Sequence, residues 1–161
     1  MPGYWERQEA TAESFADGHF LHTGDVCRMD PEGWFYVIDR AKDMINAAGY
    51  KVWPREVEDF LYQHPAVREA AVVGVPDPYR GETVKAFVAL QPASSVTPEE
   101  LIEFCRQRMA AYKYPRSVEI VDEVPKTATG KFLRRELRDR LNGPTQMGPA
   151  PTPEGPAGSG G

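Results

Sequence analysis

The clearest pattern of apolar and polar positions lies just after Pro54. Three apolar side chains recur every third or fourth position and so share one face of a helix: Val57, Phe60 and Leu61. The acidic side chains between them are expected to face solvent: Glu56, Glu58 and Asp59. Proline suits the first turn of a helix, and the pair His64-Pro65 is expected to end it. The pattern therefore predicts a surface helix that begins at Pro54.

Three short apolar runs predict the strands of one central sheet. Residues 70–75 form a continuous apolar run, which is typical of a buried strand. Residues 82–90 alternate well enough to be its partner, and residues 118–121 give a third strand. The sequence Pro76-Asp77-Pro78 is expected to break the first of these strands, because proline removes a backbone donor.

Two further helices are expected to flank this sheet. Thr97 and Glu100 have the spacing of a capping box, with a proline at the first helical position. The helix that they open is expected to bury four side chains: Leu101, Ile102, Cys105 and Met109. A basic helix is predicted over residues 132–141. The order of elements predicts an α+β fold: a small domain with a central three-stranded sheet, a short β-hairpin and flanking helices.

The first 38 residues differ from the rest, because nothing nearby covers their apolar side chains. A weakly apolar helix is predicted over residues 6–15, and strands over residues 26–29 and 34–38 are joined by the turn-forming residues 30–33. Residues 142–161 hold six Gly, five Pro and only one large apolar residue, Met147, so burial cannot offset the entropy of ordering. We therefore predict three parts: an edge of a larger body over 1–38, a compact domain over 39–141 and a disordered tail over 142–161.

Composition excludes several classes of protein. The 161 residues carry a net charge of −5, and no run approaches the roughly 18 apolar residues of a membrane-spanning helix. The N-terminus lacks the basic and apolar regions of a signal peptide. Cys27 and Cys105 are too few for a disulfide framework and are expected to be small core residues. We expect a cytoplasmic protein with no metal site, no transmembrane segment and no nucleic-acid partner.

Two polar stretches are candidates for chemistry. The sequence His22-Thr23-Gly24-Asp25 is either a plain turn or a site where the Asp25 carboxylate accepts hydrogen bonds from vicinal hydroxyls such as those of ribose. Residues 39–43, Asp-Arg-Ala-Lys-Asp, are either a solvated charged turn or a hinge. The hinge interpretation follows from their position between the uncovered first part and the compact second part.

A third candidate is the loop of residues 125–131, in which Lys126 and Lys131 flank hydroxyl residues and a glycine. The loop lacks the Walker A spacing, but a lysine on a glycine loop can deliver its charge to a phosphate or a carboxylate. The alternative is a surface turn before a basic helix. Residues 126–140 contain six basic and two acidic side chains, so binding of nucleic acid or of another anionic surface is a rival interpretation.

Taken together and in this order, these stretches resemble the C-terminal part of the adenylate-forming enzymes, the superfamily of acyl-CoA synthetases, luciferases and peptide-synthetase adenylation domains. The resemblance extends from Gly3 to Leu141 and is densest over five stretches: residues 22–25, 39–58, 64–67, 74–77 and 125–135. Within the superfamily, residues 39–43, Tyr112-Lys113-Tyr114-Pro115 and residues 125–131 are most similar to medium- and long-chain fatty-acyl-CoA ligases.

The resemblance implies a reaction and a role for each matching residue. Such enzymes join a carboxylic acid to AMP from ATP, release pyrophosphate and pass the acyl group to coenzyme A. By resemblance, Asp25 and Arg40 bind the nucleotide ribose, Lys42 is the hinge, Lys131 is the catalytic lysine of adenylation and Gly49 lies on the coenzyme A path. ATP, Mg²⁺ and coenzyme A are thereby implied for the full-length enzyme, with none bound tightly by this chain alone.

The sequence departs from the family in lacking the large N-terminal adenylation domain, of which residues 1–38 are interpreted as a remnant. The chain is therefore expected to be inactive alone and to have that domain as its partner. The alternative is a separate lid subunit that acts in trans. The uncovered hairpin around Trp34-Phe35-Tyr36 is expected to be disordered, paired with a second copy or folded back on the compact domain, and self-association is expected to involve residues 1–38. By resemblance, Lys131 is also a target for a lysine acetyltransferase.

Overall fold

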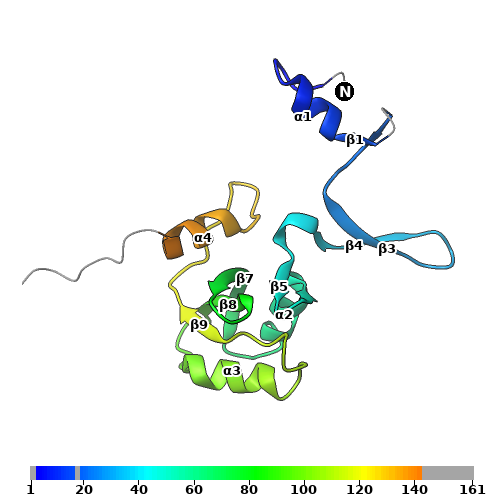
Figure 1. Cartoon of the computed structure of the whole chain (residues 1–161). Helices are drawn as coiled ribbons and strands as arrows, with labels where there is room; N and C mark the ends of the chain where they lie inside the picture. The colour runs from blue at the N-terminus through cyan, green and yellow to red at the C-terminus, as the bar shows by residue number, and fades with distance from the viewer. Residues whose placement is uncertain (1–2, 17–18, 143–161) are drawn as a thin grey trace, which may run out of the picture.

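The computed structural model describes residues 3–16 and 19–142, so the predicted tail from residue 143 onward lies outside the described residues. Figure 1 shows a body in which helices pack on a sheet, a hairpin that extends away from the body and a short N-terminal segment beyond the hairpin. Among the described residues, no helix is long and apolar enough to cross a membrane.

The N-terminal part begins with the short helix α1 (Gln8–Glu13) and the paired two-residue strands β1 (Phe15–Ala16) and β2 (Phe20–Leu21). The predicted hairpin follows as β3 (Asp25–Met29) and β4 (Phe35–Arg40), which pair antiparallel. Its turn is fixed by Asp30, whose carboxylate accepts hydrogen bonds from the Trp34 N–H at 2.8 Å and from the Tyr36 hydroxyl at 2.9 Å.

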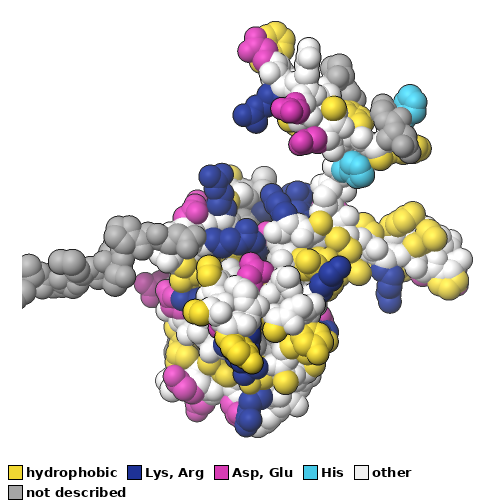
Figure 2. All heavy atoms as spheres, viewed as in Figure 1, with side chains coloured by type: hydrophobic (Ala, Val, Ile, Leu, Met, Phe, Trp, Pro, Cys, Tyr) yellow, Lys and Arg dark blue, Asp and Glu magenta, His cyan; other side chains and the backbone are white. Residues whose placement is uncertain are grey.

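The hairpin is formed in the structure, but it leaves large apolar side chains uncovered. Trp34, Phe35 and Val37 are exposed to 70%, 71% and 63%, and Figure 2 shows yellow side chains along the projecting hairpin. The hairpin does not fold back over the body, so that expected arrangement is wrong for this structure. This apolar surface is available to a partner.

The body is built on one sheet with strand order β6-β5-β8-β7, to which β9 adds beside β8. The three predicted strands are present as β7 (Val67–Asp77), β8 (Gly81–Leu90) and β9 (Ser117–Ile120), and β9 runs parallel to β8. After the 3-10 turn η1 (Ala41–Asp43), the chain adds two short strands that the sequence did not reveal, β5 (Ile45–Ala47) and β6 (Tyr50–Val52). The α+β class is confirmed.

Helices cover both faces of this sheet, which explains why the strands are apolar without alternation. Alternate residues of β7, such as Ala70 and Val72, face the core formed with α2 (Pro54–Leu61) and α3 (Pro98–Arg106). The residues between them, such as Ala71 and Val73, face a second core that includes Leu137 of α4 (Arg134–Asn142). Every buried apolar side chain among the described residues lies at or after Ile45.

The N-terminus of α3 has the predicted capping box. The Thr97 hydroxyl accepts the Glu100 N–H at 3.2 Å, and the Glu100 carboxylate accepts the Thr97 N–H at 2.8 Å. Leu101 and Cys105 of this helix are fully buried, while Ile102 and the following Met109 are half-buried. The sequence therefore identified the inner face of α3.

Three expectations are wrong. Strand β7 does not end at Pro76 but pairs through it to Asp77, which is possible because β7 is an edge strand and the proline needs no donor on its open side. Glu58 does not face solvent but is 5% exposed. Cys27 is exposed on the hairpin, whereas Cys105 is buried as expected, and burial raises the pKa of its thiol to about 11.

Candidate functional site

The base of the β3–β4 hairpin joins two predicted site residues. Asp25 and Arg40 are cross-strand partners, and the Arg40 Nε lies 3.2 Å from the Asp25 Oδ1. The turn before β3 is held at both ends, because the Asp25 N–H donates to the Thr23 hydroxyl at 3.2 Å and the Ala41 N–H donates to the Gly24 carbonyl at 2.9 Å. The Asp25 backbone is thereby held in the turn, and its side chain is paired with an arginine.

Lys131 lies on a hydrogen-bonded turn. The Thr127 N–H donates to the Lys131 carbonyl at 2.8 Å, and the Lys131 N–H donates to the Thr127 hydroxyl at 3.1 Å. Gly130 has φ +81°, a left-handed conformation that suits glycine in a tight turn. The turn presents an exposed lysine that takes part in none of the ion pairs among the described residues.

The fold brings the hairpin base and this turn onto one cleft of about 500 Å³. Asp25 and Arg40 line it from the hairpin, and Lys131 and Arg134 line it from the segment that begins α4. The other lining residues are Val37, Ile38, Asp39 and Arg55. Three of the five predicted site residues therefore share one cleft that offers a carboxylate for hydroxyl groups and cations for an anion.

Lys42 lines an adjoining cleft of about 520 Å³ that shares Arg40, Lys131 and Arg134 with the first. It belongs to η1, and its side chain is exposed. Figure 2 shows dark blue lysine and arginine side chains gathered on this side of the body, near α4. The predicted hinge position is therefore at the edge of a basic surface and between the hairpin and the body.

Gly49 lies apart from both clefts, at the turn between β5 and β6. Its φ is +85° and that of Ala48 is +53°, and the Gly49 N–H donates to the Asn46 Oδ1 at 3.1 Å. A Cβ added at Gly49 would meet no atom within 4 Å, so its glycine is required by the backbone of the turn and not by crowding. Beside this turn lies a cavity of about 200 Å³, lined by residues that include Tyr50, Arg80, Tyr112 and Arg116.

A buried ionic cluster supports the Lys131 turn from below, and sequence reasoning missed it. The Arg134 Nη2 donates to both Glu58 carboxylate oxygens at 2.9 Å, and the Val72 N–H donates to the Glu58 Oε1 at 2.8 Å. Asp43 accepts a hydrogen bond from Arg138 at 2.7 Å and lies 3.7 Å from Arg134. The cluster ties the start of α4 to α2 and to η1.

Burial governs the electrostatics of this cluster. Desolvation raises the pKa of Glu58, although Arg134 and the Val72 N–H both oppose the shift. Desolvation disfavours the charge of Arg134, yet the surrounding carboxylates of Glu58, Asp39 and Asp43 together raise its pKa. Only a signal that pairs positions far apart in the chain could have found this cluster, because Arg134 follows Glu58 by 76 positions.

Ion pairs also engage much of the basic charge between residues 126 and 140. Lys126 lies 2.5 Å from Glu69, which anchors the base of the Lys131 turn to β7. Arg134 and Arg138 donate inward to Glu58 and Asp43. These contacts leave fewer free cations on α4 than the sequence count indicated, which weakens the interpretation of the helix as a nucleic-acid surface.

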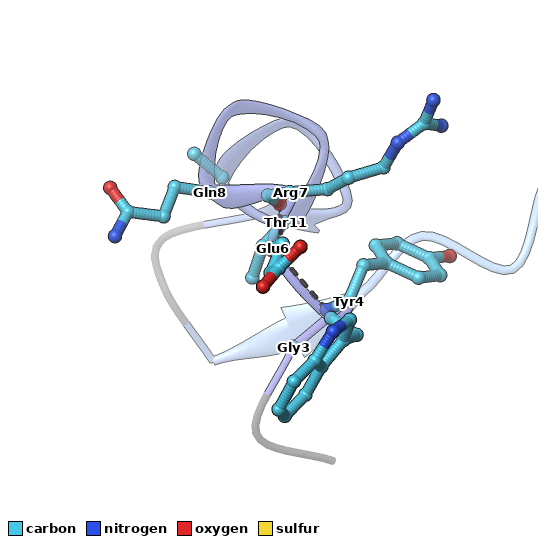
Figure 3. Close-up of a pocket in the computed structure, with 8 residues that line it drawn as sticks. Gly3, Tyr4, Glu6, Arg7, Gln8 and Thr11 are labelled. Carbon is cyan, nitrogen blue, oxygen red and sulfur yellow. Dashed lines mark hydrogen bonds between the residues drawn. The ribbon is translucent and has the colours of Figure 1, made fainter.

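The remaining features do not form a site of comparable chemistry. A cavity of about 570 Å³ in the N-terminal segment is lined by Gly3 to Gln8, Thr11 and Ala12, and Figure 3 shows its wall held by a hydrogen bond of 2.9 Å from the Tyr4 N–H to the Thr11 hydroxyl. Across residues 3–16 and 19–142, no three His, Cys, Asp or Glu side chains are grouped so that they could hold a metal ion.

Residues 56–131 match the AMP-binding enzyme C-terminal domain, and this part of the chain belongs to that family. The matched range begins within α2 and includes β7, β8, α3, β9 and Lys131, whereas β5 and β6 precede it. The match thus identifies residues 56–131 as the C-terminal domain of an adenylate-forming enzyme.

Individual relatives agree with this assignment. The chain is 55% identical over 137 residues to a long-chain-fatty-acid–CoA ligase of Bacillus subtilis, which covers 85% of this chain and 24% of the relative. It is 49% identical over 141 residues to a feruloyl-CoA synthase of Amycolatopsis, and this alignment covers 88% of this chain and 28% of that enzyme. The chain therefore spans about a quarter of the length of the curated relatives that it matches.

Solved structures match the same share of the chain. ATP-bound MatB from Rhodopseudomonas palustris superimposes with a TM-score of 0.83 at 32% identity, over 86% of this chain and 28% of that protein. A fatty acyl CoA synthetase of Mycobacterium tuberculosis gives a TM-score of 0.65 at 39% identity, over 86% of this chain and 27% of that protein.

Proposed function

We propose that this chain is the lid of an ATP-dependent fatty-acyl-CoA ligase. Such a ligase forms an acyl-adenylate and pyrophosphate from a carboxylate and ATP, and then transfers the acyl group to the thiol of coenzyme A. The observation that carries the proposal is the shared cleft, because Asp25, Arg40 and Lys131 converge there from two distant parts of the chain. The names of the ligase relatives support the substrate class.

The first half-reaction brings an anionic carboxylate to an anionic phosphate. A lysine between them offsets the repulsion and orients the attack. Lys131 suits this role because its turn is ordered and its side chain is exposed. In this proposal, Asp25 accepts hydrogen bonds from the ribose hydroxyls, and Arg40, which already orients Asp25, assists at the same sugar.

We assign the hinge to Lys42, because η1 lies between the hairpin and the body. A short turn between two folded parts can absorb the rotation of one relative to the other. Rotation at η1 would move Lys131 away and free the cleft for the second half-reaction.

The second half-reaction is assigned to the face that carries Gly49. The cavity beside its turn combines Arg80 and Arg116 with the rings of Tyr50 and Tyr112, which stack at 4.3 Å. Arginines and stacked aromatic rings suit the phosphates and the base of a nucleotide such as coenzyme A. The large domain would supply the acyl pocket and the Mg²⁺ site.

The test replaces the matching C-terminal part of the Bacillus subtilis ligase with this chain. We expect the chimera to catalyse ATP–pyrophosphate exchange and Lys131→Ala to lower the rate by about 10²–10³-fold, as for loss of a charge that stabilises the transition state. Lys51→Ala, an exposed lysine on β6, is the matched control and keeps the rate. Exchange by this chain alone, or an unaffected Lys131→Ala chimera, would refute the proposal.

Partners and location belong to the same proposal. If the chain acts in trans, then mixing it with a lid-less ligase restores thioester formation without a covalent fusion.

The exposed ammonium of Lys131 is accessible to a lysine acetyltransferase, which would remove the charge. Mass spectrometry of protein from cells that finds Lys131 always unmodified would remove this regulation. The proposed cytoplasmic location is checked by fractionation of the same cells.

A further inference from the structure

We propose that Asp39 is a positioning residue that holds the body against strand β4 in the orientation in which Lys131 shares the cleft with Asp25 and Arg40. The inference deepens the proposed function, on which it rests only for its catalytic consequence. Its structural content concerns the orientation of two parts of this chain and is measured without nucleotide.

Asp39 is the one buried residue of β3 and β4. The rest of the hairpin is exposed or half-buried, whereas Asp39 is only 7% exposed. Its Oδ1 accepts the Arg40 N–H at 2.8 Å, and its Oδ2 accepts the Arg55 N–H at 3.0 Å. A carboxylate is buried at little cost only where such donors replace water, so its burial depends on the body that supplies the second donor.

The second donor belongs to the start of α2, which has no cap of its own. Trp53 occupies the position before the helix and makes no capping hydrogen bond with its side chain, and Pro54 follows it. The first turn of a helix leaves backbone N–H groups without partners and carries a partial positive charge. Asp39 meets both needs from another element, so it acts as the N-cap of α2.

This contact crosses the proposed hinge. Among the described residues, the bond between Asp39 and Arg55 is the sole hydrogen bond that joins a residue before Lys42 to one beyond Met44, and no ion pair makes that connection. The charge of Arg134 adds a longer-range attraction, since Asp39 is among the carboxylates that raise its pKa. The orientation of the body therefore depends strongly on one side chain.

Rotation at η1 has to break this contact, because Asp39 lies before the hinge and Arg55 lies after it. The rotated state then leaves the Arg55 N–H at the start of α2 without this partner and leaves the Asp39 carboxylate with the Arg40 N–H alone. Asp39 thus favours the orientation observed here over the rotated one. In the proposed reaction, it would favour the state for adenylation.

The test exploits the one exposed thiol of the chain. Cys27 on the hairpin accepts a nitroxide label, while Cys105 is buried with a raised pKa and does not react. The label broadens the amide signals of Gly130 and Lys131 when the body holds the observed orientation. We expect Asp39→Ala to lower the ratio of this orientation to the others about fivefold, which corresponds to about 1 kcal/mol, the usual effect of losing an N-cap.

The matched control is Asp59→Ala, an exposed aspartate of α2, which keeps the broadening of the unsubstituted chain. Asp39→Asn, which retains one acceptor oxygen, is expected to recover part of it. The β7 and β8 amide signals report whether the body stays folded, and we expect them to be unchanged. Equal broadening in Asp39→Ala and the unsubstituted chain, or none in either, would overturn the inference. Neither result bears on the exchange activity of the chimera, so the two proposals fail separately.

Discussion

At the scale of single residues, the decisive side chains are charged ones whose partners are distant in sequence. Asp39, Asp43 and Glu58 are all buried, although their local sequence is typical of solvated positions. Each is paired with an arginine or a backbone N–H group of another element. Removing one partner of such a buried pair costs more than the pair itself contributes, because the other charge stays unpaired.

The raised pKa of Glu58 leads to a prediction about pH. A raised value means that the folded protein prefers the protonated carboxyl, so this contribution to stability is complete below the unfolded pKa and is lost as pH rises through the folded one. The ordinary pKa of a glutamate carboxyl is 4.5. We expect the free energy of unfolding of the unsubstituted chain, relative to that of Glu58→Gln, to fall as the pH rises above this value. Urea unfolding at several pH values measures this difference.

The control for this series is Glu123→Gln, which changes an exposed glutamate on the same body. It is expected to show no comparable trend over that pH range. A stability difference for Glu58→Gln that stays constant, or that grows with pH, contradicts the raised pKa.

At the scale of elements, the strands of the central sheet could be predicted because both of their faces are covered. Residues 70–75 therefore appear as a continuous apolar run. The short strands β5 and β6 could not be predicted, because Asn46 and Lys51 are exposed and each strand has only three residues. Pro76 was misleading for a different reason, since whether a proline ends a strand depends on whether that strand lies at an edge.

The capping box of α3 gives a second prediction. Thr97→Ala removes the hydroxyl that accepts the Glu100 N–H, and the expected loss of stability is about 1 kcal/mol. For a domain of about 100 residues, this lowers the melting temperature by roughly 4–8 °C. Calorimetry measures the shift, with the nearby exposed Ser95→Ala as the control. Equal melting temperatures for the two variants would show that the cap contributes nothing.

At the scale of the whole molecule, the residues that line the candidate site could be predicted from the sequence, but the buried residues that hold them in place could not. The sequence identified Asp25, Arg40 and Lys131 through their motifs, and the structure places them on one cleft. It could not identify the buried cluster or the cap at Asp39, because neither has a local motif. The roles assigned to all five site residues, Lys42 and Gly49 included, remain predictions.

The exposed hairpin predicts self-association of this chain. Trp34 and Phe35 are uncovered side chains that would gain from burial against any apolar partner. We expect the apparent mass in sedimentation velocity to rise with concentration, and the double variant Trp34→Ser and Phe35→Ser to abolish the rise. Tyr79→Ser removes an aromatic ring that is 90% exposed on the body and is expected to leave it unchanged. Concentration-independent sedimentation of the unsubstituted chain contradicts the expectation.

The division of the buried apolar side chains has a consequence for how such a protein can evolve. Within the part of the chain that the structure describes, all of them lie at or after Ile45, whereas Asp25 and Arg40 lie before it. Substitutions at Asp25 and Arg40 can therefore change the cleft without removing a buried apolar contact of the body. Selection can act on the cleft and on the thermal stability of the body through separate sets of positions.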